Sequence, residues 1–202
     1  MVPSPHASFG GEPMRRWMAA TAVAAVTAGG AWAQPAIPAG VEDTSFVEAN
    51  GDRVLQLSAV IDAPGGNVWQ TFSTAEGWKQ LGVKMAAVDF RVGGVIETSY
   101  TAGAKPGDPG NIKNEIVAYV PDRLLAIRNV QAPPGFAHAQ EFGRTATVIE
   151  MEPAEVGKTR LRITGVGFKP GTAFDDLYGK FLAGNAYTLD LLRKSWAEPA
   201  PK

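Results

Sequence analysis

The chain has 202 residues, of which 19 are Lys or Arg and 20 are Asp or Glu, so its formal net charge at pH 7 is −1. This balance, without any run of like charge, excludes the strongly basic surface by which proteins bind nucleic acid or anionic membranes. Cysteine is absent, which excludes disulfides, thiolate metal sites and a cysteine nucleophile. No cofactor-binding motif is present either, so we expect no cofactor and no metal.

Residues 1–33 have the features of an export signal. The basic pair Arg15-Arg16 precedes an apolar run over residues 17–27, and residues 31–33 read Ala-Trp-Ala, the small–x–small form that signal peptidase accepts. The apolar run is shorter than the roughly 20 residues that span a bilayer. We therefore expect cleavage after residue 33 and a periplasmic or secreted protein without a membrane span. Export by the Sec or the Tat route, and translation from Met1 or Met14, are both left open.

Residues 34–51 contain prolines and glycines with little periodicity, which predicts an N-terminal arm. The domain itself is expected over residues 52–198. Its first element is a half-buried strand over residues 53–62, in which four apolar residues alternate with polar ones: Leu55, Leu57, Ala59 and Ile61.

Two short helices are expected next. Residues 67–81 carry apolar side chains at helical spacing, and Ser73-Thr74 interrupts them with a residue type that caps a second helix. Further strand signals then follow at residues 88–92, 95–101, 112–120, 124–130, 145–151 and 159–166. The connections between them are short and rich in Gly and Pro, which favours an antiparallel meander.

A long C-terminal helix is expected from residue 172 to residue 196. Its apolar side chains follow the i, i+3, i+4, i+7 spacing of an amphipathic helix. Thr172, with Asp175 three residues later, predicts a capping-box start. Gly179 and Gly184 weaken the helix, which suggests close packing or a bend at these positions. A helix of this length is roughly 35 Å long at 1.5 Å per residue, enough to cover a whole sheet.

Three segments carry a family resemblance. Residues 63–78 contain A-P, V-W-x-x-F and E-G-W in that order, residues 88–94 read VDFRVGG, and residues 115–124 contain E-I-V followed by P-D-R-L. Together with the order of the elements, these motifs resemble the START-like (SRPBCC) superfamily, which also includes polyketide cyclases. Within it they are similar to the branch named after the activator of the Hsp90 ATPase. The resemblance covers about residues 53–196.

The resemblance implies an α+β helix-grip fold. In this fold a strongly curved antiparallel sheet of about seven strands wraps around a long C-terminal α-helix, two short helices follow the first strand, and a cavity remains between sheet and helix. The superfamily includes binding proteins as well as enzymes, so the resemblance implies the fold without an activity. Because the chain is expected to be exported, the co-chaperone's action on a cytosolic chaperone is not carried over.

Polar and aromatic residues on the strands and the long helix are candidates to line this cavity and orient a ligand. The expected ligand-binding residues are Trp78, Tyr100, Arg128, Phe136, Tyr178, Phe181 and Asn185. For Trp78 the alternative is core packing. For Arg128 it is a cross-strand pair with a glutamate on the outer face of the sheet.

The candidates for acid–base chemistry are His138, Tyr100 and Glu115. Among the residues after the expected cleavage site, His138 is the one histidine, the side chain that titrates near neutral pH, although a surface position is its alternative role. Three functional hypotheses follow. The first is binding or carriage of a small hydrophobic molecule, a lipid or an aromatic compound; the second is a cyclase-like or dehydratase-like enzyme; the third is a protein-interaction domain. Neither the ligand nor the oligomeric state follows from the sequence.

Overall fold

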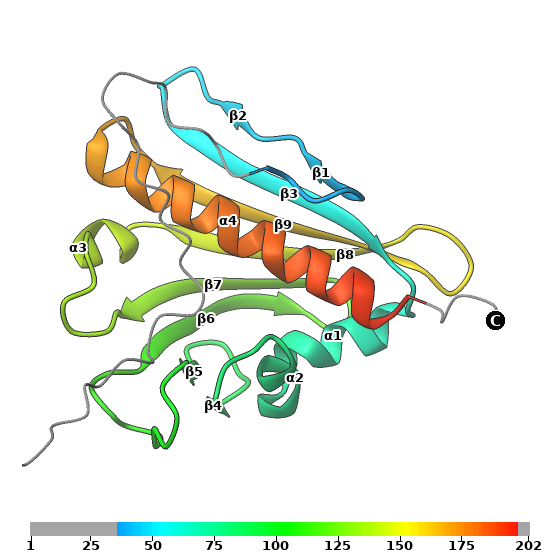
Figure 1. Ribbon diagram of the computed structural model, residues 1–202, viewed down its shortest axis with the longest axis horizontal. Coiled ribbons are helices and arrows are strands. Elements are labelled where there is room, and N and C mark those ends of the chain that lie inside the picture. The colour runs from blue at the N-terminus through cyan, green and yellow to red at the C-terminus, as the bar shows by residue number, and fades with distance from the viewer. Residues whose placement is uncertain (1–35, 198–202) are drawn as a thin grey trace, which may run out of the picture. The chain divides into compact units, whose positions relative to one another are not determined.

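The computed structural model describes residues 36–197 (Figure 1). The expected export signal, residues 1–33, lies outside this range. The described part has the α+β helix-grip architecture, with an antiparallel sheet and a long C-terminal helix, which confirms the expected fold class. None of the helices within residues 36–197 is both long and apolar enough to cross a membrane.

One antiparallel sheet contains all the described strands. Its neighbour order is β1-β3-β9-β8-β7-β6-β5-β4, and β2 also pairs with β3. The strands are β1 (Val41–Asp43), β2 (Phe46–Val47), β3 (Arg53–Ile61), β4 (Met85–Val88), β5 (Val95–Ser99), β6 (Ile112–Val120), β7 (Leu124–Gln131), β8 (Ala146–Pro153) and β9 (Thr159–Phe168). From β4 to β8 each strand pairs with the next along the chain, as expected for a meander.

The sheet has nine strands instead of about seven because part of the N-terminal arm pairs with it. Val41 of β1 lies opposite Ala59, and Phe46 of β2 lies opposite Val54, so both short strands run along the free edge of β3. The backbone N–H and C=O groups of that edge supply the hydrogen-bonding partners. The arm therefore belongs to the domain from Val41 onward.

The strand expected over residues 88–92 lies earlier in the chain, at Met85–Val88. The following segment is a turn that leads into β5. Gly93 has a φ of +77°, and a Cβ on Gly94 would lie 2.0 Å from the carbonyl oxygen of Asp89. The two glycines of the VDFRVGG motif are thus required by the turn between β4 and β5.

Helices α1 (Gly65–Ser73) and α2 (Ala75–Gln80) confirm the two short helices. Thr74 ends α1 and caps α2, since its hydroxyl oxygen accepts a hydrogen bond from the Gly77 amide at 3.0 Å. A Cβ on Gly77 would lie 2.2 Å from the carbonyl oxygen of Gln70, so only glycine permits the observed approach of the two helices. This approach holds Trp78 against Phe72, with ring centroids 5.9 Å apart.

Helix α4 (Thr172–Ser195) is the expected long helix, but the expected capping box is not formed. Gly171 is the N-cap, and Thr172 is already the first helical residue. Asp175 instead forms an ion pair with Arg53 on β3 at 2.6 Å. The start of α4 is therefore tied to the sheet by an ion pair.

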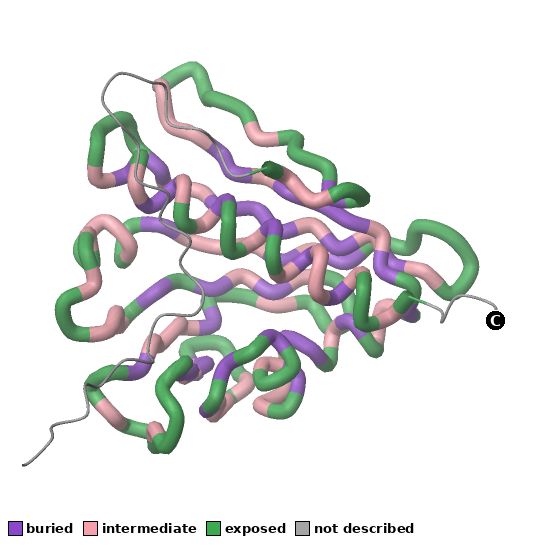
Figure 2. Tube along the Cα trace, in the orientation of Figure 1, coloured by how far each residue is buried: buried purple, intermediate pink, exposed green. Residues whose placement is uncertain are grey.

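Helix α4 packs mainly on β3 and β9, and α1 packs on β8 and β9. Buried residues concentrate along the strands, as Figure 2 shows. The largest fully buried side chains include Leu55 and Leu57 of β3, Leu161 of β9 and Leu177 of α4. Since α4 lies on the β3 and β9 side of the sheet, the strands from β5 to β7 are covered less closely by the helix. A cavity lies at this position.

Candidate functional site

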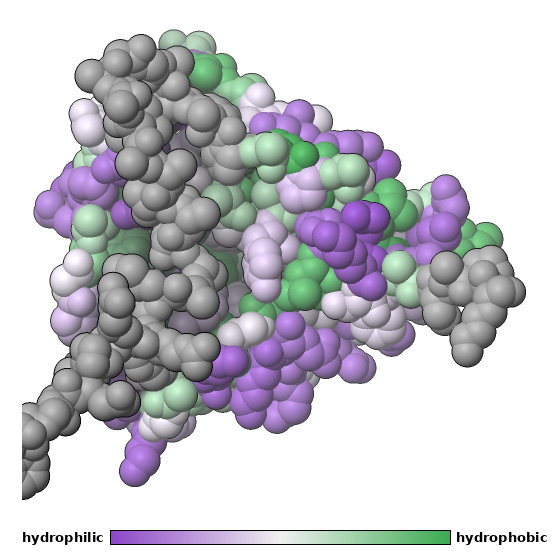
Figure 3. All heavy atoms as spheres, viewed as in Figure 1, coloured by the Kyte–Doolittle hydropathy of each residue, from purple (hydrophilic) through white to green (hydrophobic). Residues whose placement is uncertain are grey.

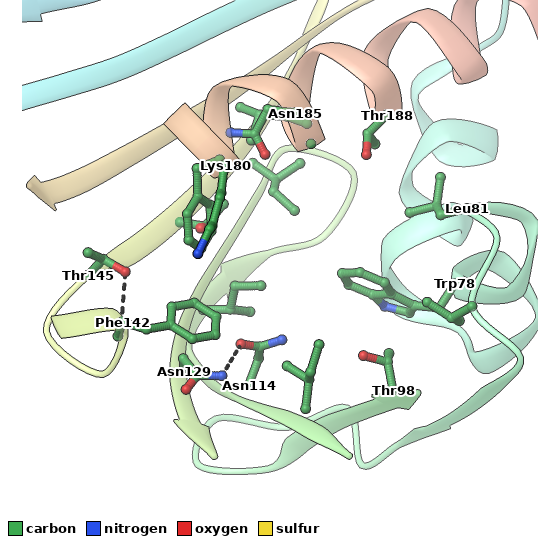
Figure 4. A pocket seen from close by; sticks show the side chains of 18 of the residues that line it. Trp78, Leu81, Thr98, Asn114, Asn129, Phe142, Thr145, Lys180, Asn185 and Thr188 are labelled. Atoms are coloured by element: carbon green, nitrogen blue, oxygen red, sulfur yellow. Dashed lines mark hydrogen bonds between the residues drawn. The ribbon is translucent and has the colours of Figure 1, made fainter. Parts of the chain in front are cut away.

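A cavity of about 300 Å³ lies between α4 and the inner face of the sheet (Figure 4). Side chains from the strands, from the α1–α2 region, from α4 and from the segment around helix α3 (Ala139–Phe142) form its walls. Most of these side chains are apolar: Phe72, Trp78, Leu81, Val83, Ile112, Ile127, Phe136, Phe142, Ile149, Ile163 and Phe181. The wall can therefore contact an apolar ligand over much of its surface.

Aromatic rings form two parts of the wall. Near α3, the ring of Phe142 lies 5.5 Å from that of Phe136 and 5.2 Å from that of Phe181. In the α1–α2 region, Trp78 is held by a hydrogen bond that its indole Nε1 donates to the carbonyl oxygen of Phe72 at 2.9 Å. Both aromatic groups are thus fixed by contacts within the protein, which leaves their ring surfaces available to a ligand.

Polar side chains also reach the cavity, from the inner face of the sheet and from α4. They are Thr98, Tyr100, Asn114, Asn129, Thr145, Thr147, Lys180, Asn185 and Thr188. Some are already paired: Asn129 donates to the carbonyl oxygens of Gln131 (3.0 Å) and Lys113 (3.2 Å), and Thr145 donates to that of Phe142 (2.9 Å). Because these donors already form hydrogen bonds within the wall, they are not free to bind a ligand.

Asn114 and Asn185 retain unused hydrogen-bonding capacity. Asn114 Oδ1 accepts a hydrogen bond from Asn129 at 3.4 Å, and Figure 4 shows its amide nitrogen on the side away from Asn129. The Nδ2 of Asn185 is buried and has no hydrogen-bond partner among the described residues. A buried amide without a partner costs free energy that a polar ligand group can recover.

Tyr100 differs from the other lining residues because it is mostly exposed. It follows the end of β5, 66% of its surface is accessible, and Tyr187 of α4 is exposed to a similar degree, 62%. Burial of part of the side chain, and then the neighbouring Tyr187, raise the pKa of the Tyr100 hydroxyl. The large exposed fraction argues that solvent keeps this effect small. Tyr100 stays protonated at neutral pH.

Five of the seven expected ligand-binding residues line the cavity: Trp78, Tyr100, Phe136, Phe181 and Asn185. Tyr178 does not line it. Its ring lies 5.4 Å from that of Phe168, and the guanidinium of Arg53 lies 4.4 Å from its centroid. Tyr178 therefore packs on β3 and β9, whereas Phe181, one turn later in α4, contacts Phe168 as well and also reaches the cavity.

Arg128 and Glu115 also lie away from the cavity, on the outer face of the sheet. Their side chains form a cross-strand ion pair at 2.7 Å. The neighbours Ile127 and Asn129 line the cavity, so Arg128, which lies between them on β7, must point outward. The cross-strand pair with a glutamate on the outer face, the alternative stated for Arg128, is the arrangement found.

His138, the remaining acid–base candidate, is not among the residues that line the cavity. It adopts a left-handed backbone conformation (φ 63°) immediately before α3, and its Nε2 lies 3.1 Å from Oδ2 of Asp176 on α4. Its neighbours Phe136 and Phe142 do reach the cavity. The histidine therefore links the α3 segment to α4 beside the cavity.

Several polar lining residues were not expected from the sequence, among them Thr98, Asn114, Lys180 and Thr188. A signal for Asn114 was present, since it alternates in phase with Ile112 and Ile116, which face inward. Lys180 and Thr188 border the helical stripe that contains Phe181 and Asn185, and such edge positions are commonly solvated. The sequence pattern alone does not distinguish a solvated edge from a cavity wall.

Comparison of the fold with solved structures gives many similar chains. The dimeric Aha1 of Colwellia psychrerythraea has a TM-score of 0.56 at 17% identity, covering 71% of this chain and 95% of that one. CalU16 of Micromonospora echinospora has a TM-score of 0.53 at 18% identity, with 79% and 87% covered. Protein MLL2253 of Mesorhizobium loti has a TM-score of 0.56 at 20% identity, with 70% and 95% covered. At these identities the likeness shows a shared fold.

Among curated proteins, none matches the sequence. The sequence does match a protein family, described as Activator of Hsp90 ATPase homolog 1-like protein, over residues 62–195. This segment begins at the end of β3 and extends to the end of α4, so it includes every element that lines the cavity. The chain therefore belongs to the Activator of Hsp90 ATPase homolog 1-like family of the SRPBCC superfamily, as the three sequence motifs indicated.

Proposed function

We propose that the protein binds or carries a small hydrophobic molecule, a lipid or an aromatic compound, in the cavity between the sheet and α4. The observation that carries this proposal is the cavity itself, about 300 Å³ in volume and lined mainly by aliphatic and aromatic side chains. Sites for small molecules begin at about this size and have largely apolar walls with a few polar groups. Such a wall gains free energy when a ligand displaces water from it.

The positions of the acid–base candidates support binding rather than catalysis. A cyclase-like or dehydratase-like reaction needs an acid or base within hydrogen-bond reach of the substrate. His138 and Glu115 do not line the cavity, and Tyr100, which does, is exposed and has a raised pKa. In the described part of the chain no Asp, Glu or His lines the cavity, and its titratable lining groups are Tyr100 and Lys180.

The place of action is part of the same proposal. The basic pair at residues 15 and 16, the apolar run and the Ala-Trp-Ala sequence support export and cleavage after Ala33. Expression in a Gram-negative host, followed by fractionation and intact-mass measurement, tests this. A periplasmic product that begins at residue 34 is the expected result; a full-length cytoplasmic product would contradict it.

Two glycines of α4 give a matched test of binding. An added Cβ at Gly184, which lines the cavity, or at Gly179, which does not, would meet no atom within 4 Å. Gly184→Trp should place its ring at the cavity, whereas Gly179→Trp makes the same change five residues, about 1.4 turns, earlier in the helix. Both gain the same intrinsic helix propensity over glycine.

The probe is phenylnaphthylamine, a neutral dye whose fluorescence rises in apolar surroundings. We expect saturable binding to the wild type, similar binding to Gly179→Trp and at least tenfold weaker binding to Gly184→Trp. Native mass spectrometry of the exported protein then shows whether an apolar molecule co-purifies. Absence of dye binding to the wild type, or equal binding to both variants, would contradict the proposal.

A further inference from the structure

Among the described residues that line the cavity, Lys180 is the one lysine or arginine, and this inference rests on the proposed binding function. None of the ion pairs within residues 36–197 includes it. The basic residues at the other end of α4 behave differently, since Arg193 and Lys194 both pair with Asp190. The cavity thus contains a positive charge without a negative one.

The position of Lys180 is defined by an aromatic contact. Its Nζ lies 5.4 Å from the centroid of the Phe136 ring, within the range of a cation–π interaction. Figure 4 shows the ammonium group pointing from α4 toward the interior of the cavity, beside Phe142. This contact places the charge of the solvent-exposed Lys180 side chain at the α3 end of the cavity.

The neutral polar groups of the wall are suited to the same kind of partner. Hydroxyls of Thr147 and Thr188 and the carboxamides of Asn114 and Asn185 can each donate a hydrogen bond. The Nδ2 of Asn185, five residues after Lys180 on α4, is a donor without a described partner. A cation among several potential donors, without a carboxylate, favours a ligand group that accepts hydrogen bonds and carries negative charge.

The opposite part of the cavity is richer in apolar side chains. Figure 4 shows Trp78 and Leu81 across the cavity from Lys180, together with the hydroxyls of Thr98 and Thr188. Phe72, whose ring packs against Trp78, also belongs to this wall. From this asymmetry we infer that the ligand is a small amphipathic acid, with its carboxylate or similar oxyanion next to Lys180 and its apolar body toward Trp78. Both aliphatic and aromatic acids have this chemistry.

Two dyes that differ in one group test the inference. Anilinonaphthalene sulfonate carries an anionic sulfonate, and phenylnaphthylamine has the same ring system without it. For the full chain we expect the anionic dye to bind more tightly at low salt and to lose this advantage as salt screens the charges. Competition by fatty acids and aromatic acids, compared with the corresponding alcohols, then identifies the apolar body.

Lys180→Met keeps the aliphatic stem and removes the charge. We expect it to weaken binding of the anionic dye about tenfold, because a charge-assisted hydrogen bond is lost, and to change neutral-dye binding less than about twofold. Lys180→Arg should retain the preference. Lys194→Met is the control, since it removes the same charge from the same helix about 21 Å further along at 1.5 Å per residue.

The outcomes separate the two proposals. Equal affinity of the wild type for both dyes, or an unchanged preference in Lys180→Met, would overturn the acidic-ligand inference while cavity binding remains. Failure of both dyes to bind would remove the binding function itself. Thermal unfolding and near-ultraviolet circular dichroism of each variant establish that the anionic dye reports on the folded cavity and not on a partly unfolded state.

Discussion

The Nε2 of His138 lies 3.1 Å from the Oδ2 of Asp176, and this contact joins the α3 segment to α4. Phe136 and Phe142, on either side of the histidine in the sequence, both line the cavity. The pair therefore fastens one wall of the cavity to the helix that forms another. Release of this contact is expected to affect access to the cavity more than the stability of the sheet.

We predict that His138→Ala increases the mobility of the α3 segment. Loss of one partly exposed contact should cost less than about 1 kcal/mol of global stability. Amide hydrogen exchange over residues 132–143 should nevertheless become several-fold faster, because the segment opens locally. Dissociation of a bound dye should accelerate in parallel. Asp176→Asn should give a similar change, and unchanged exchange in both variants would show that the contact does not hold the segment.

Gly77→Ala should be strongly destabilising. The new methyl group would lie 2.2 Å from the Gln70 carbonyl oxygen and 2.5 Å from the Thr71 Cα, both of them backbone atoms that cannot move independently. Overpacking of this kind costs roughly 1–3 kcal/mol or more. Urea unfolding followed by tryptophan fluorescence measures the loss. Gly66→Ala is the control, since its nearest contact would be 3.8 Å away; a similar cost in both would contradict the steric explanation.

Glu115→Gln should leave dye binding unchanged. The carboxylate pairs with Arg128 on the outer face, at 2.7 Å, and does not reach the cavity. Exposed ion pairs of this kind contribute about 0–1 kcal/mol, so the loss in unfolding free energy should be small. Equilibrium dye titration and urea unfolding provide the measurements. A large loss of binding would mean that Glu115 acts on the cavity through the strand.

Because its side chain is largely exposed, Tyr100 should make the protein only slightly less stable at high pH. Its folded-state pKa is raised above 10.0, so between the unfolded and folded pKa values the unfolded chain has already lost the proton that the folded protein keeps. Unfolding is then favoured by deprotonation, and stability falls as pH rises above about 10. Tyr100→Phe should weaken this fall. Urea unfolding at pH 9 to 11, with an absorbance titration of tyrosine, tests it; an unchanged pH profile would contradict it.

The long helix and the strand faces could be predicted because they follow from periodicity. Phe174, Leu177 and Leu182 recur at helical spacing and are buried. The alternation in β3 likewise places Leu55 and Leu57 in the core. Which face of a helix or strand is buried follows from the spacing of apolar residues within that element, so it can be predicted without knowledge of the other elements.

The cavity residues were harder to predict because their direction depends on neighbouring strands. Glu115 and Arg128 each lie in a strand with apolar residues of both parities, so periodicity left their side undefined. In β6 the register also shifts between Lys113 and Asn114 and again between Ile116 and Ala118. Such irregularities change which residues oppose each other, and they are set by the paired strand as well as by the sequence of β6 itself.

The start of α4 and the pairing of the N-terminal arm with β3 could not be predicted from the sequence for a similar reason. Thr172 and Asp175 have the spacing of a capping box, but Asp175 pairs with Arg53, which is distant in sequence. The arm residues of β1 and β2 form strands only because β3 offers them an edge. Interactions between segments far apart in the chain decide both cases.

The pairing of β1 and β2 with β3 also has a consequence for self-association. Without residues 41–47, the nine-residue strand β3 would present a long row of unsatisfied backbone groups to other molecules. At the opposite border of the sheet, β4 has only four residues and offers little room for such pairing. By covering the edge of β3, the short arm thus protects the sheet from edge-to-edge aggregation. A recombinant chain trimmed to begin at Asp52 would lose that protection.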